Sequence, residues 1–537
     1  MYFPLKILSL EKNRKTMAAK KYPLGIQTFS EIVNGNYFYA DKTSIVYQLA
    51  HYAKFHFLSR PRRFGKSLFV STLQAYFEGR KELFKELAID SLEKEWMAFP
   101  VVHFDLSCGK YYNLENTHTI LNGILQIEER KYGIDVKPEE SKAYGTRLKN
   151  ILIAATEQSG RQAVVLIDEY DAPMHDSLND EHLQNSIRNI MRDFFSPLKQ
   201  QEGNLRFVFI TGISKFSQLS IFSELNNLKI LSLKDEYSSC CGITEKELTT
   251  YFKEGIEEMA QHNGLTYEET LAQLKTHYDG YHFSANGDDV YNPYSIINAL
   301  DDKDFSNYWF ASGTPTFLIE MLQKRNMDIL ALDNLWIQAS RFDAPTERIT
   351  DPIPILYQSG YLTIKSYERT TRLYRLCFPN QEVRRGFSDN LVKFYTTDCM
   401  NEYDDIVYAY ATNVVQNDDM EAFLPHLKTF YDKFPYTIIN NNERHYQAVM
   451  FTILTMLGAD VQAEHPTSDG RIDILLKTKN TIYVFELKYK KSSANAVAQI
   501  QEKDYAKAFA YDKRKVVKIG INFSKDQRSI DDWKLNE

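Results

Sequence analysis

Three side chains near the C-terminal end of the sequence have the types that metal-dependent phosphodiester cleavage requires: Asp473, Glu486 and Lys488. Asp473 lies in the apolar segment 471–476 and the other two lie in the segment 481–489, so both segments are predicted to be strands. Side chains alternate along a strand, which places Glu486 and Lys488 on one face. Hard cations such as Mg²⁺ prefer carboxylate oxygens, and a bound cation lowers the pKa of an attacking water. The lysine is suited to orienting that water or to neutralising charge on the phosphate.

Two predicted helices flank these strands. The segment 443–454 has amphipathic spacing and begins with Glu443, and the segment 496–505 carries Gln499. The resulting order is a helix with a carboxylate, a strand with Asp, a strand with Glu-x-Lys, and a helix with Gln. This order resembles the PD-(D/E)XK nuclease superfamily over about residues 435–522.

The resemblance implies a role for each of these side chains. Asp473 and Glu486 are expected to bind Mg²⁺, with Mn²⁺ as an alternative. Lys488 is expected to be catalytic, and Glu443 and Gln499 are expected to support catalysis. A Glu-x-Lys pair alone is also common on exposed strands, and a domain of this kind can bind nucleic acid without cutting it.

A second phosphate-handling pattern lies in the segment 60–67, Arg-Pro-Arg-Arg-Phe-Gly-Lys-Ser. It follows the apolar segment 55–59 and precedes the segment 68–77, which has helical spacing. A strand, a loop with Gly-Lys-Ser and a helix are the context of a P-loop, where backbone N–H groups hold phosphate. Lys66 is predicted to reach the β- and γ-phosphates, and Ser67 to coordinate Mg²⁺. The predicted nucleotide-contacting residues of this segment are Arg63, Phe64, Gly65, Lys66, Ser67 and Leu68.

Two further apolar segments end in polar residues. The first ends at Asp168 and Glu169 and has the form of a Walker B strand. We predict that Asp168 binds Mg²⁺ through water and that Glu169 polarises the attacking water, although an acid pair after a strand is also an ordinary start for a helix. The second segment, 205–212, contains Thr211, which resembles a sensor of the γ-phosphate, with Ser214 as the weaker candidate.

Arg60 stands where the P-loop motif has its first glycine, so the motif alone is incomplete. Several longer segments nevertheless resemble one bacterial family, the AAA-ATPase-like proteins that carry a C-terminal nuclease-like domain. The resemblance extends over about residues 20–522 and implies binding of ATP with Mg²⁺. The segments that carry it are 22–32, 39–43, 60–67, 166–171, 278–281, 291–295 and 378–380.

The expected fold class is α/β with several domains. It consists of an AAA-like P-loop NTPase domain, a helical and winged-helix-like middle region and a C-terminal α/β domain of the PD-(D/E)XK, restriction-endonuclease-like type. The middle region is expected to act as a lid or to contact DNA. The expected boundaries are a leader that need not be folded over 1–21, the P-loop domain over 22–235, the lid over 236–380, a helical connector over 381–434, the nuclease-like domain over 435–522 and a tail over 523–537.

Composition narrows the class of protein. The chain has 537 residues, of which 43% are hydrophobic and 25% are charged, which is ample for several packed domains. Its five cysteines lack zinc spacing and a paired framework, so we expect reduced thiols in a cytoplasmic protein. No apolar stretch approaches the length of a membrane span, so we expect no membrane partner.

The net charge of −7 does not point to nucleic acid by itself, because a nucleic-acid binder needs only a local basic surface. Lysines gather around the predicted metal site, where they are either solvated faces or contacts to a phosphate backbone. We expect a nucleic-acid partner, DNA rather than RNA, and leave a homo-oligomer open. The favoured function is an ATP-binding and ATP-hydrolysing protein with a metal-dependent nuclease. The alternatives are an NTP switch, or a STAND-like regulatory ATPase, whose C-terminal domain binds nucleic acid or a partner without cleaving it.

Overall fold

The structure is a computed structural model, and the chain divides into two compact units. The N-terminal unit comprises residues 1–271 and 290–304, and the C-terminal unit comprises residues 272–289 and 305–537. The region 236–380, which the sequence suggests as one lid, is therefore shared between both units. The residues that the structure describes are 20–178, 180–215, 228–309, 329–346, 351–395, 400–432, 442–468, 470–524 and 529–536.

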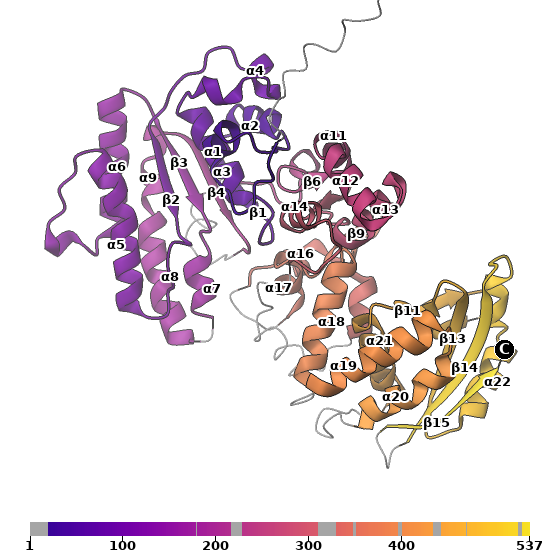
Figure 1. Cartoon of the computed structure of the whole chain (residues 1–537). Coiled ribbons are helices and arrows are strands. Elements are labelled where there is room, and N and C mark those ends of the chain that lie inside the picture. Colours follow the sequence, from indigo (N-terminus) through magenta and orange to yellow (C-terminus); the bar gives the residue numbers. More distant parts are fainter. Residues whose placement is uncertain are drawn as a thin grey trace, which may run out of the picture. The chain divides into compact units, whose positions relative to one another are not determined.

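A parallel sheet of five strands forms the centre of the N-terminal unit (Figure 1). Its strands are paired in the order β2-β3-β4-β1-β5, and every pairing is parallel. Strands β1 and β3 are buried along their whole length, as expected for a sheet with helices on both faces. The strands are β1 Phe55–Ser59, β2 Val101–Asp105, β3 Ala163–Asp168, β4 Leu205–Gly212 and β5 Lys229–Ile230.

Alternation along the strands explains how both faces are covered. Val208 and Ile210 of β4 belong to the core that contains the long helices α5 (Leu114–Lys131), α6 (Tyr144–Ser159) and α8 (Glu181–Phe195). Phe207 and Phe209, which alternate with them, contact instead Phe77 and Phe69 of α3 (Lys66–Phe77). The helix that follows the predicted P-loop therefore packs on one face, and the three long helices pack on the other.

The strand order determines where the predicted site residues meet. Strand β4 lies between β1, which precedes the predicted P-loop, and β3, which ends at Asp168. Because the carboxyl ends of parallel strands lie at one edge of a sheet, the loop after β1, the acids after β3 and the end of β4 come together there.

The rest of the N-terminal unit is mainly helical. A short antiparallel pair joins β6 (Ile243–Thr244) to β7 (Val290–Tyr291), and α11 (Glu245–Tyr251) starts with a capping box formed by Thr244 and Glu247. The segment that begins the described chain is also anchored, because Lys21 forms a bridge with Tyr37. Most of the predicted leader, residues 1–19, lies outside the described residues. The remaining helices of this unit include α12 (Lys253–Asn263) and α14 (Pro293–Asp302), and α13 (Tyr267–Tyr278) follows α12.

The C-terminal unit contains a helix that is followed by two strands. Helix α17 (Ile353–Gln358) is followed by β9 (Thr363–Glu368) and β10 (Leu373–Cys377). An additional strand, β8 (Leu335–Gln338), pairs with β10, so that the three form an antiparallel sheet in the order β8-β10-β9.

A second sheet of five strands forms the end of the chain, in the order β11-β12-β13-β14-β15. Only β13 and β14 run parallel, and the other pairs are antiparallel. The mixed sheet and the parallel N-terminal sheet confirm the predicted α/β class. The elements are α21 (Glu443–Met456), β11 (Asp460–Thr467), β12 (Gly470–Lys477), β13 (Thr481–Tyr489), α22 (Ser493–Glu502), β14 (Lys515–Phe523) and β15 (Ile530–Asn536).

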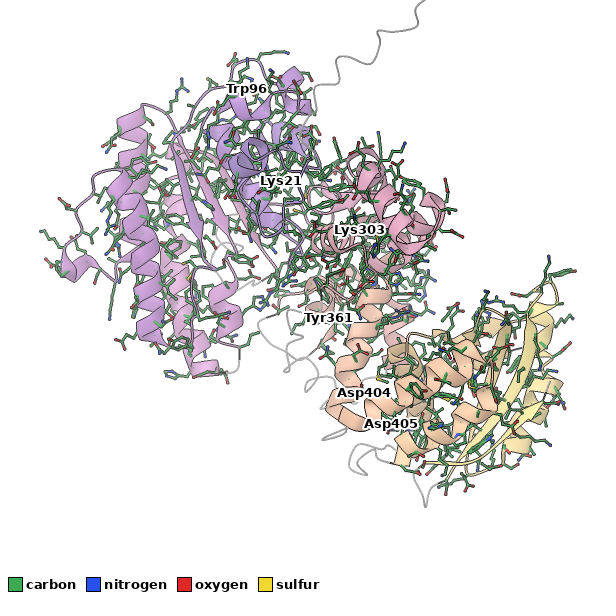
Figure 2. All side chains as sticks on the ribbon, in the orientation of Figure 1. Lys21, Trp96, Lys303, Tyr361, Asp404 and Asp405 are labelled. Atoms are coloured by element: carbon green, nitrogen blue, oxygen red, sulfur yellow. The ribbon has the colours of Figure 1, made fainter. Side chains whose placement is uncertain are left out.

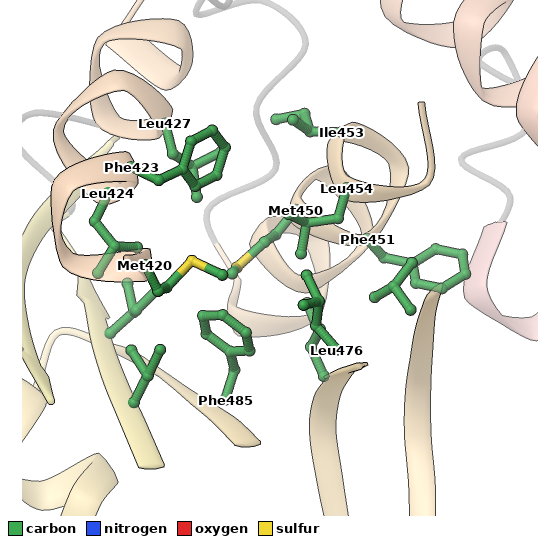
Figure 3. Close-up of a cluster of buried hydrophobic side chains, with 14 of the residues drawn as sticks. Met420, Phe423, Leu424, Leu427, Met450, Phe451, Ile453, Leu454, Leu476 and Phe485 are labelled. Atoms are coloured by element: carbon green, nitrogen blue, oxygen red, sulfur yellow. The ribbon is translucent and has the colours of Figure 1, made fainter. Parts of the chain in front are cut away.

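The predicted connector contains three helices, α18 (Gln381–Tyr395), α19 (Met400–Ala409) and α20 (Met420–Asp432). Helices α19 and α20 contribute side chains to the core of this second sheet, whereas α18 packs on α21. Figure 3 shows Met420, Phe423 and Leu427 of α20 beside Met450 of α21 and Phe485 of β13, all buried in one cluster. The apolar face of α20 must be buried somewhere, and it packs on the sheet. The segment is therefore not a free connector.

Two acidic side chains, Asp404 and Asp405, are exposed on α19 (Figure 2). Among the described residues, no helix is both long and apolar enough to cross a membrane.

Two predicted boundaries at the C-terminal end change. The segment 523–537, predicted as a tail, contains β15, which completes the sheet against β14. Its sequence contains charged residues and lacks a clear apolar alternation, which is why the pattern gave no strand. The helix predicted over 496–505 ends at Glu502, because Asp504 adopts a left-handed φ of 43° and Tyr505 begins a separate turn of 3₁₀ helix, Tyr505–Phe509.

Candidate active sites

The loop after β1 has the backbone conformation of a phosphate-binding loop, although its first glycine is missing. Its left-handed residues are Arg63, with φ 66°, and Gly65, with φ 86°. Arg60 does not need that conformation, so a glycine is not required at its position. Its buried guanidinium instead donates to the carbonyls of Ser232 and Tyr237, at 2.9 and 3.0 Å, and ties the loop base to the segment after β5.

The predicted lysine and acids meet at the edge of the sheet. Lys66 is buried, and its Nζ lies 3.1 Å from Oε1 of Glu169 and donates to the carbonyl of Pro61 at 3.2 Å. Asp168 ends β3 and is 3% exposed, and its Oδ1 accepts from the backbone N–H of Glu169 at 3.0 Å. In this arrangement Glu169 holds the ammonium group that a γ-phosphate would attract.

The charge of Asp168 is costly in this position. Burial, followed by the nearby Glu169 carboxylate, raises the pKa of Asp168 to about 6, and Ser67 and Lys66 oppose that rise. A cation beside Ser67 and Asp168 would relieve this cost, because an opposite charge favours the ionised carboxylate. Both residues fit the predicted hydrated Mg²⁺ ion, because hydroxyl and carboxylate oxygens are hard ligands.

The predicted sensor residues are both engaged by protein groups. Thr211 is fully buried on β4, and its hydroxyl donates to the carbonyl of Leu58 at 2.9 Å. Ser214 is also buried, and its hydroxyl donates to Oδ2 of Asp171 at 2.9 Å and lies 2.7 Å from Nε2 of His175. Either hydroxyl would have to change its partner to read a phosphate.

Asp171 organises the turn after β4. Its buried carboxylate accepts from the backbone N–H groups of Ile213 and Ser214, with distances of 2.7–3.2 Å. Burial raises the pKa of Asp171, but the hydrogen-bonded His175 and Ser214 outweigh it and leave the pKa below its usual value. The sequence placed Asp171 beside the Walker B acids without assigning it a role.

An apolar cavity of about 80 Å³ adjoins the loop within the N-terminal unit. Three predicted nucleotide-contacting residues, Phe64, Gly65 and Leu68, form part of its wall. Aromatic and aliphatic side chains from the segment before β1, from α3 and from the helical region after β5 form much of the rest; they include Phe38, Tyr39, Phe69, Phe252 and Ile297. The sequence did not identify this cavity, because its walls come from segments far apart in the chain.

Arg63 contacts the helical region of the same unit. Its guanidinium lies 3.7 Å from the centre of the Tyr294 ring, at the start of α14. This is the distance of a cation–π contact. The contact joins the loop to the segment 291–295, which the sequence singled out without assigning it a function.

The carboxylate site of the second sheet is built where two strands separate. The backbone ladder between β12 and β13 ends at the pair Ile474–Phe485. Beyond it, Oδ2 of Asp473 accepts from the backbone N–H of Leu487 at 2.8 Å. The Asp473 side chain therefore replaces a backbone acceptor, and this fixes its carboxylate beside β13.

Glu486 and Lys488 share a face of β13, as the alternation predicts. Both are buried, at 1% and 5% exposure, and Nζ of Lys488 donates to Oε1 of Glu486 at 2.7 Å. Oε2 of Glu486 is also buried and has no hydrogen-bond partner in the part of the chain that the structure describes. An ionised carboxylate oxygen in that situation is unstable without a cation or a proton.

The flanking helices bring the remaining predicted residues to the same place. Glu443, the first residue of α21, accepts from the backbone N–H of Tyr489 through Oε2 at 3.2 Å. Gln499 lies on α22, close enough to Glu486 to lower the pKa of that carboxyl. The five predicted residues of this site therefore converge, three from two strands and one from each flanking helix.

The pKa values describe a crowded acidic cluster. Burial and then Glu486 raise the pKa of Asp473 to about 7. Burial also raises the pKa of Glu486, although Lys488 opposes it. For Lys488, burial lowers the pKa but the surrounding carboxylates, Glu486 first, outweigh it, so the pKa is raised and the ammonium form is favoured.

These residues fit a divalent metal. Within the described residues, no group of three or more His, Cys, Asp or Glu side chains forms a complete cage. Mg²⁺ does not need one, because it keeps several waters and is usually held by one or two carboxylates. Asp473 and Glu486, with the unpartnered Oε2, supply that set, and a metal there would supply Lewis acidity and an activated water.

Gln447 and Glu464 are two polar residues that the sequence did not single out. Nε2 of Gln447 donates to Oε1 of Glu464 and to the carbonyl of Asp473, both at 2.8 Å. Oε2 of Glu464 in turn lies 2.7 Å from Nη1 of Arg471, which is exposed. The available signal was spacing, because Gln447 follows Glu443 by one helical turn and so shares its face.

Comparison with known proteins identifies both regions. Residues 23–222 match the family model described as Predicted AAA-ATPase, and residues 441–533 match the PD-(D/E)XK nuclease superfamily. A protein of Azotobacter chroococcum mcd 1, described as an uncharacterized protein in the vnfD 5′ region, is 32% identical over 524 residues. That similarity covers 96% of this chain and 98% of the other protein.

Proposed function

This chain belongs to the family of AAA-ATPase-like proteins with a C-terminal PD-(D/E)XK nuclease superfamily domain, and we propose that it hydrolyses ATP and cleaves nucleic acid, DNA in the first instance, with a divalent metal. The observation that carries the nuclease half is the buried, unpartnered Oε2 of Glu486 beside Asp473 and Lys488. The observation that carries the ATPase half is the ion pair between Lys66 and Glu169, at the end of a loop that contains residues in the left-handed conformation.

In the N-terminal unit, the residues have separable tasks. Lys66 leaves Glu169 for the β- and γ-phosphates, and the freed Glu169 then orients the attacking water. The backbone N–H groups at the start of α3 hold the phosphates, which the helix dipole favours. Ser67 and Asp168 would hold Mg²⁺, which would supply positive charge against the phosphates. Thr211 is the residue we propose to respond to the γ-phosphate.

The apolar cavity next to Gly65 and Leu68 is the proposed base pocket. A flat purine ring gains by leaving water for aromatic and aliphatic walls. Tyr39 and Phe252, from opposite ends of the unit's sequence, both line it. Binding of a base would therefore hold the N-terminal segment and the helical region together around the loop.

In the C-terminal unit, Asp473 and Glu486 would hold Mg²⁺ or Mn²⁺, which supplies an activated water and polarises the phosphate. Lys488 neutralises charge that develops on the phosphate, from a position fixed by its contact with Glu486. Glu443 fixes the backbone at Tyr489, directly after the lysine. Gln499 stabilises the ionised form of Glu486, because it lowers the pKa of that carboxyl.

Exposed cations near this cluster support contact with a phosphate backbone. Arg471 lies two residues before Asp473, Arg444 follows Glu443, and Lys490 and Lys491 follow the catalytic strand; all four side chains are exposed. Such contacts are independent of sequence and weaken as salt is added. The four described cysteines are free thiols, in keeping with the proposed cytoplasmic location, and Cys399 lies outside the described residues.

The test uses the purified full chain with labelled single-stranded DNA, double-stranded DNA and RNA, each with Mg²⁺ or Mn²⁺ and with or without ATP. Cleavage and binding are measured on the same samples, and Glu486→Gln is the matched control. Metal-dependent cleavage by the wild type alone supports the proposal. Binding without cleavage under every condition favours the alternative, an NTP switch that holds nucleic acid, and neither binding nor cleavage contradicts both.

A further inference from the structure

Two sequence segments that neither active site uses meet each other in the C-terminal unit. They are 278–281, Tyr-Asp-Gly-Tyr, and 378–380, Phe-Pro-Asn. Nδ2 of Asn380 donates to the carbonyl of Asp279 at 2.9 Å. Gly280 has φ 89°, and a Cβ built there would lie 2.3 Å from a carbonyl oxygen of the other segment. This close approach requires glycine, so the two motifs together form one structural element.

A cavity of about 400 Å³ lies beside this element. Its walls come from the segment 378–380, the first turn of α18, strand β10, and the end of α21 with the start of β11. It shares no lining residue with the carboxylate site. Four cationic side chains and two acidic ones line it: Lys365, Arg375, Arg384, Arg385, Asp333 and Asp460.

The cations differ in how well they are neutralised. Nη2 of Arg384 lies 2.7 Å from Oδ2 of Asp333. Arg385 donates to the carbonyl of Gly458 at 3.1 Å, which satisfies a donor but leaves its charge. These two arginines are therefore held mainly as parts of the protein framework.

Arg375 is the exception. Its guanidinium has neither a hydrogen bond nor an ion pair in the described ranges, and its Nε is buried without a partner. A buried guanidinium donor without an acceptor costs free energy. Lys365, on the neighbouring strand β9, is exposed at the same cavity. Together they leave the cavity with more positive than negative charge, even though Asp333 and Asp460 also line it.

The direction of α18 adds to the positive potential at the cavity. This helix has 15 residues, and the side chain of Asn380 caps it by accepting from the backbone N–H of Val383 at 3.0 Å. Asn380 and Gln381 at that end line the cavity, so the positive end of the helix dipole is directed at it.

We propose that this cavity binds an organic phosphate of about nucleotide size, with Arg375 and Lys365 as its anion contacts. A guanidinium presents parallel N–H donors that match phosphate oxygens, and the cavity is larger than inorganic phosphate needs. The site goes beyond the proposed ATPase and nuclease activities. The same chemistry has two sources, a free nucleotide or the phosphorylated end of a nucleic-acid strand.

The test is a thermal-shift and calorimetric titration of the full chain that carries Lys66→Ala, which removes phosphate binding at the P-loop. The probes are inorganic phosphate, AMP, dAMP, and a short DNA strand with or without a 5′-phosphate, in EDTA and at constant ionic strength. Saturable binding that raises the melting temperature is expected for AMP or dAMP, or for the 5′-phosphorylated strand alone. The first result identifies a free nucleotide as the source and the second a strand end.

Substitutions assign the binding to this cavity. Arg375→Gln is expected to weaken it about tenfold or more, and the exposed Lys365→Gln is expected to weaken it less without affecting folding. Arg369→Gln, in the turn after β9 and outside the cavity, is the matched control and should bind as the parent does. The proposal is overturned if no probe binds saturably, if AMP and dAMP fail to bind and the unphosphorylated strand binds as well as the phosphorylated one, or if Arg375→Gln and Lys365→Gln both bind as Arg369→Gln does.

Discussion

In the N-terminal unit the charged groups stand where strands end or the next segment begins, whereas in the C-terminal unit Asp473, Glu486 and Lys488 stand within two strands. Lys66 and Glu169 neutralise each other in the resting site. In the carboxylate site, Lys488 meets three acids, and Oε2 of Glu486 has no hydrogen-bond partner among the described residues. Lys66 of the first site is therefore already paired and must leave Glu169 to bind phosphate, while the charge of Asp168 is not neutralised by that pair. The second site has excess negative charge that a metal can neutralise without rearrangement.

The largest effect is expected at the second site. Glu486→Gln removes a charged metal ligand from a rigid strand, and we expect DNA cleavage to fall about a thousandfold, in the range seen when one electrostatic contact of an active site is lost. Rates are measured by gel assay in Mn²⁺. Glu464→Gln is the matched control, because Glu464 contacts Gln447 and Arg471 rather than the metal ligands, and its expected effect is less than about tenfold. Equal losses in both variants would contradict the assignment of Glu486.

The next effect concerns the first site. Lys66→Ala removes a phosphate contact made by a buried ammonium, and we expect ATP affinity to fall about a hundredfold or more. ATP binding is measured by calorimetry. The control is Lys54→Ala, because Lys54 lies just before β1 and makes an exposed contact. Because the two sites belong to separate units, the Mn²⁺-dependent nuclease rate measured without ATP should be unchanged in Lys66→Ala. A loss of that rate would show that the sites are not independent.

Acid should weaken the N-terminal unit through His56. Burial lowers the pKa of this β1 histidine to about 4, below its ordinary value of 6.5. The unfolded chain therefore binds a proton between these values and the folded chain does not, so the stability that is present above pH 6.5 is lost as the pH falls toward 4. Between pH 7.5 and pH 5 we expect a loss of about 2 kcal/mol.

Chemical unfolding of wild type and His56→Phe at both pH values measures this effect. The substitution should flatten the pH dependence of the N-terminal transition, since the phenyl ring fills a site that already contacts Phe207 and does not titrate. An unchanged pH dependence in His56→Phe would show that another group controls it.

The smallest effect is expected from the backbone conformation of the loop after β1. Gly65 has φ 86° and no atom within 4 Å of a Cβ placed there, so Gly65→Ala changes conformational preference and not packing. A left-handed alanine costs about 1–2 kcal/mol, so ATP should bind about tenfold more weakly. Gly133→Ala, with φ 66° and equally open space after α5, is the control for the backbone cost alone. It should lower stability and leave ATP affinity unchanged.

The sequence predicts the two sites to different extents, because their residues lie on different kinds of element. The apolar segments before the loop and before Asp168 predicted β1 with its observed bounds and the existence of β3, because buried parallel strands are continuous apolar runs. The sequence could not show that Arg60 is a buried tie to Ser232, because that contact joins residues far apart in the chain. It also could not show that the Thr211 hydroxyl already has a partner on β1.

In the second site, alternation was enough to bring Glu486 and Lys488 together. Gln447 contributes through a hydrogen bond to a backbone carbonyl that lies 26 positions further along the chain. Its residue type alone does not predict that contact. The edge strand β15 was missed because its charged residues suit an exposed edge. The apolar face of α20 predicted a helix but not the sheet that would cover it.

The most direct test of this account is the binding of Mn²⁺ to the nucleotide-free full chain, followed by titration calorimetry. If the carboxylate cluster is a metal site, the wild type and Glu464→Gln will each show saturable binding that Glu486→Gln and Asp473→Asn lack. No saturable Mn²⁺ binding by the wild type, or binding that survives in Glu486→Gln, would contradict it.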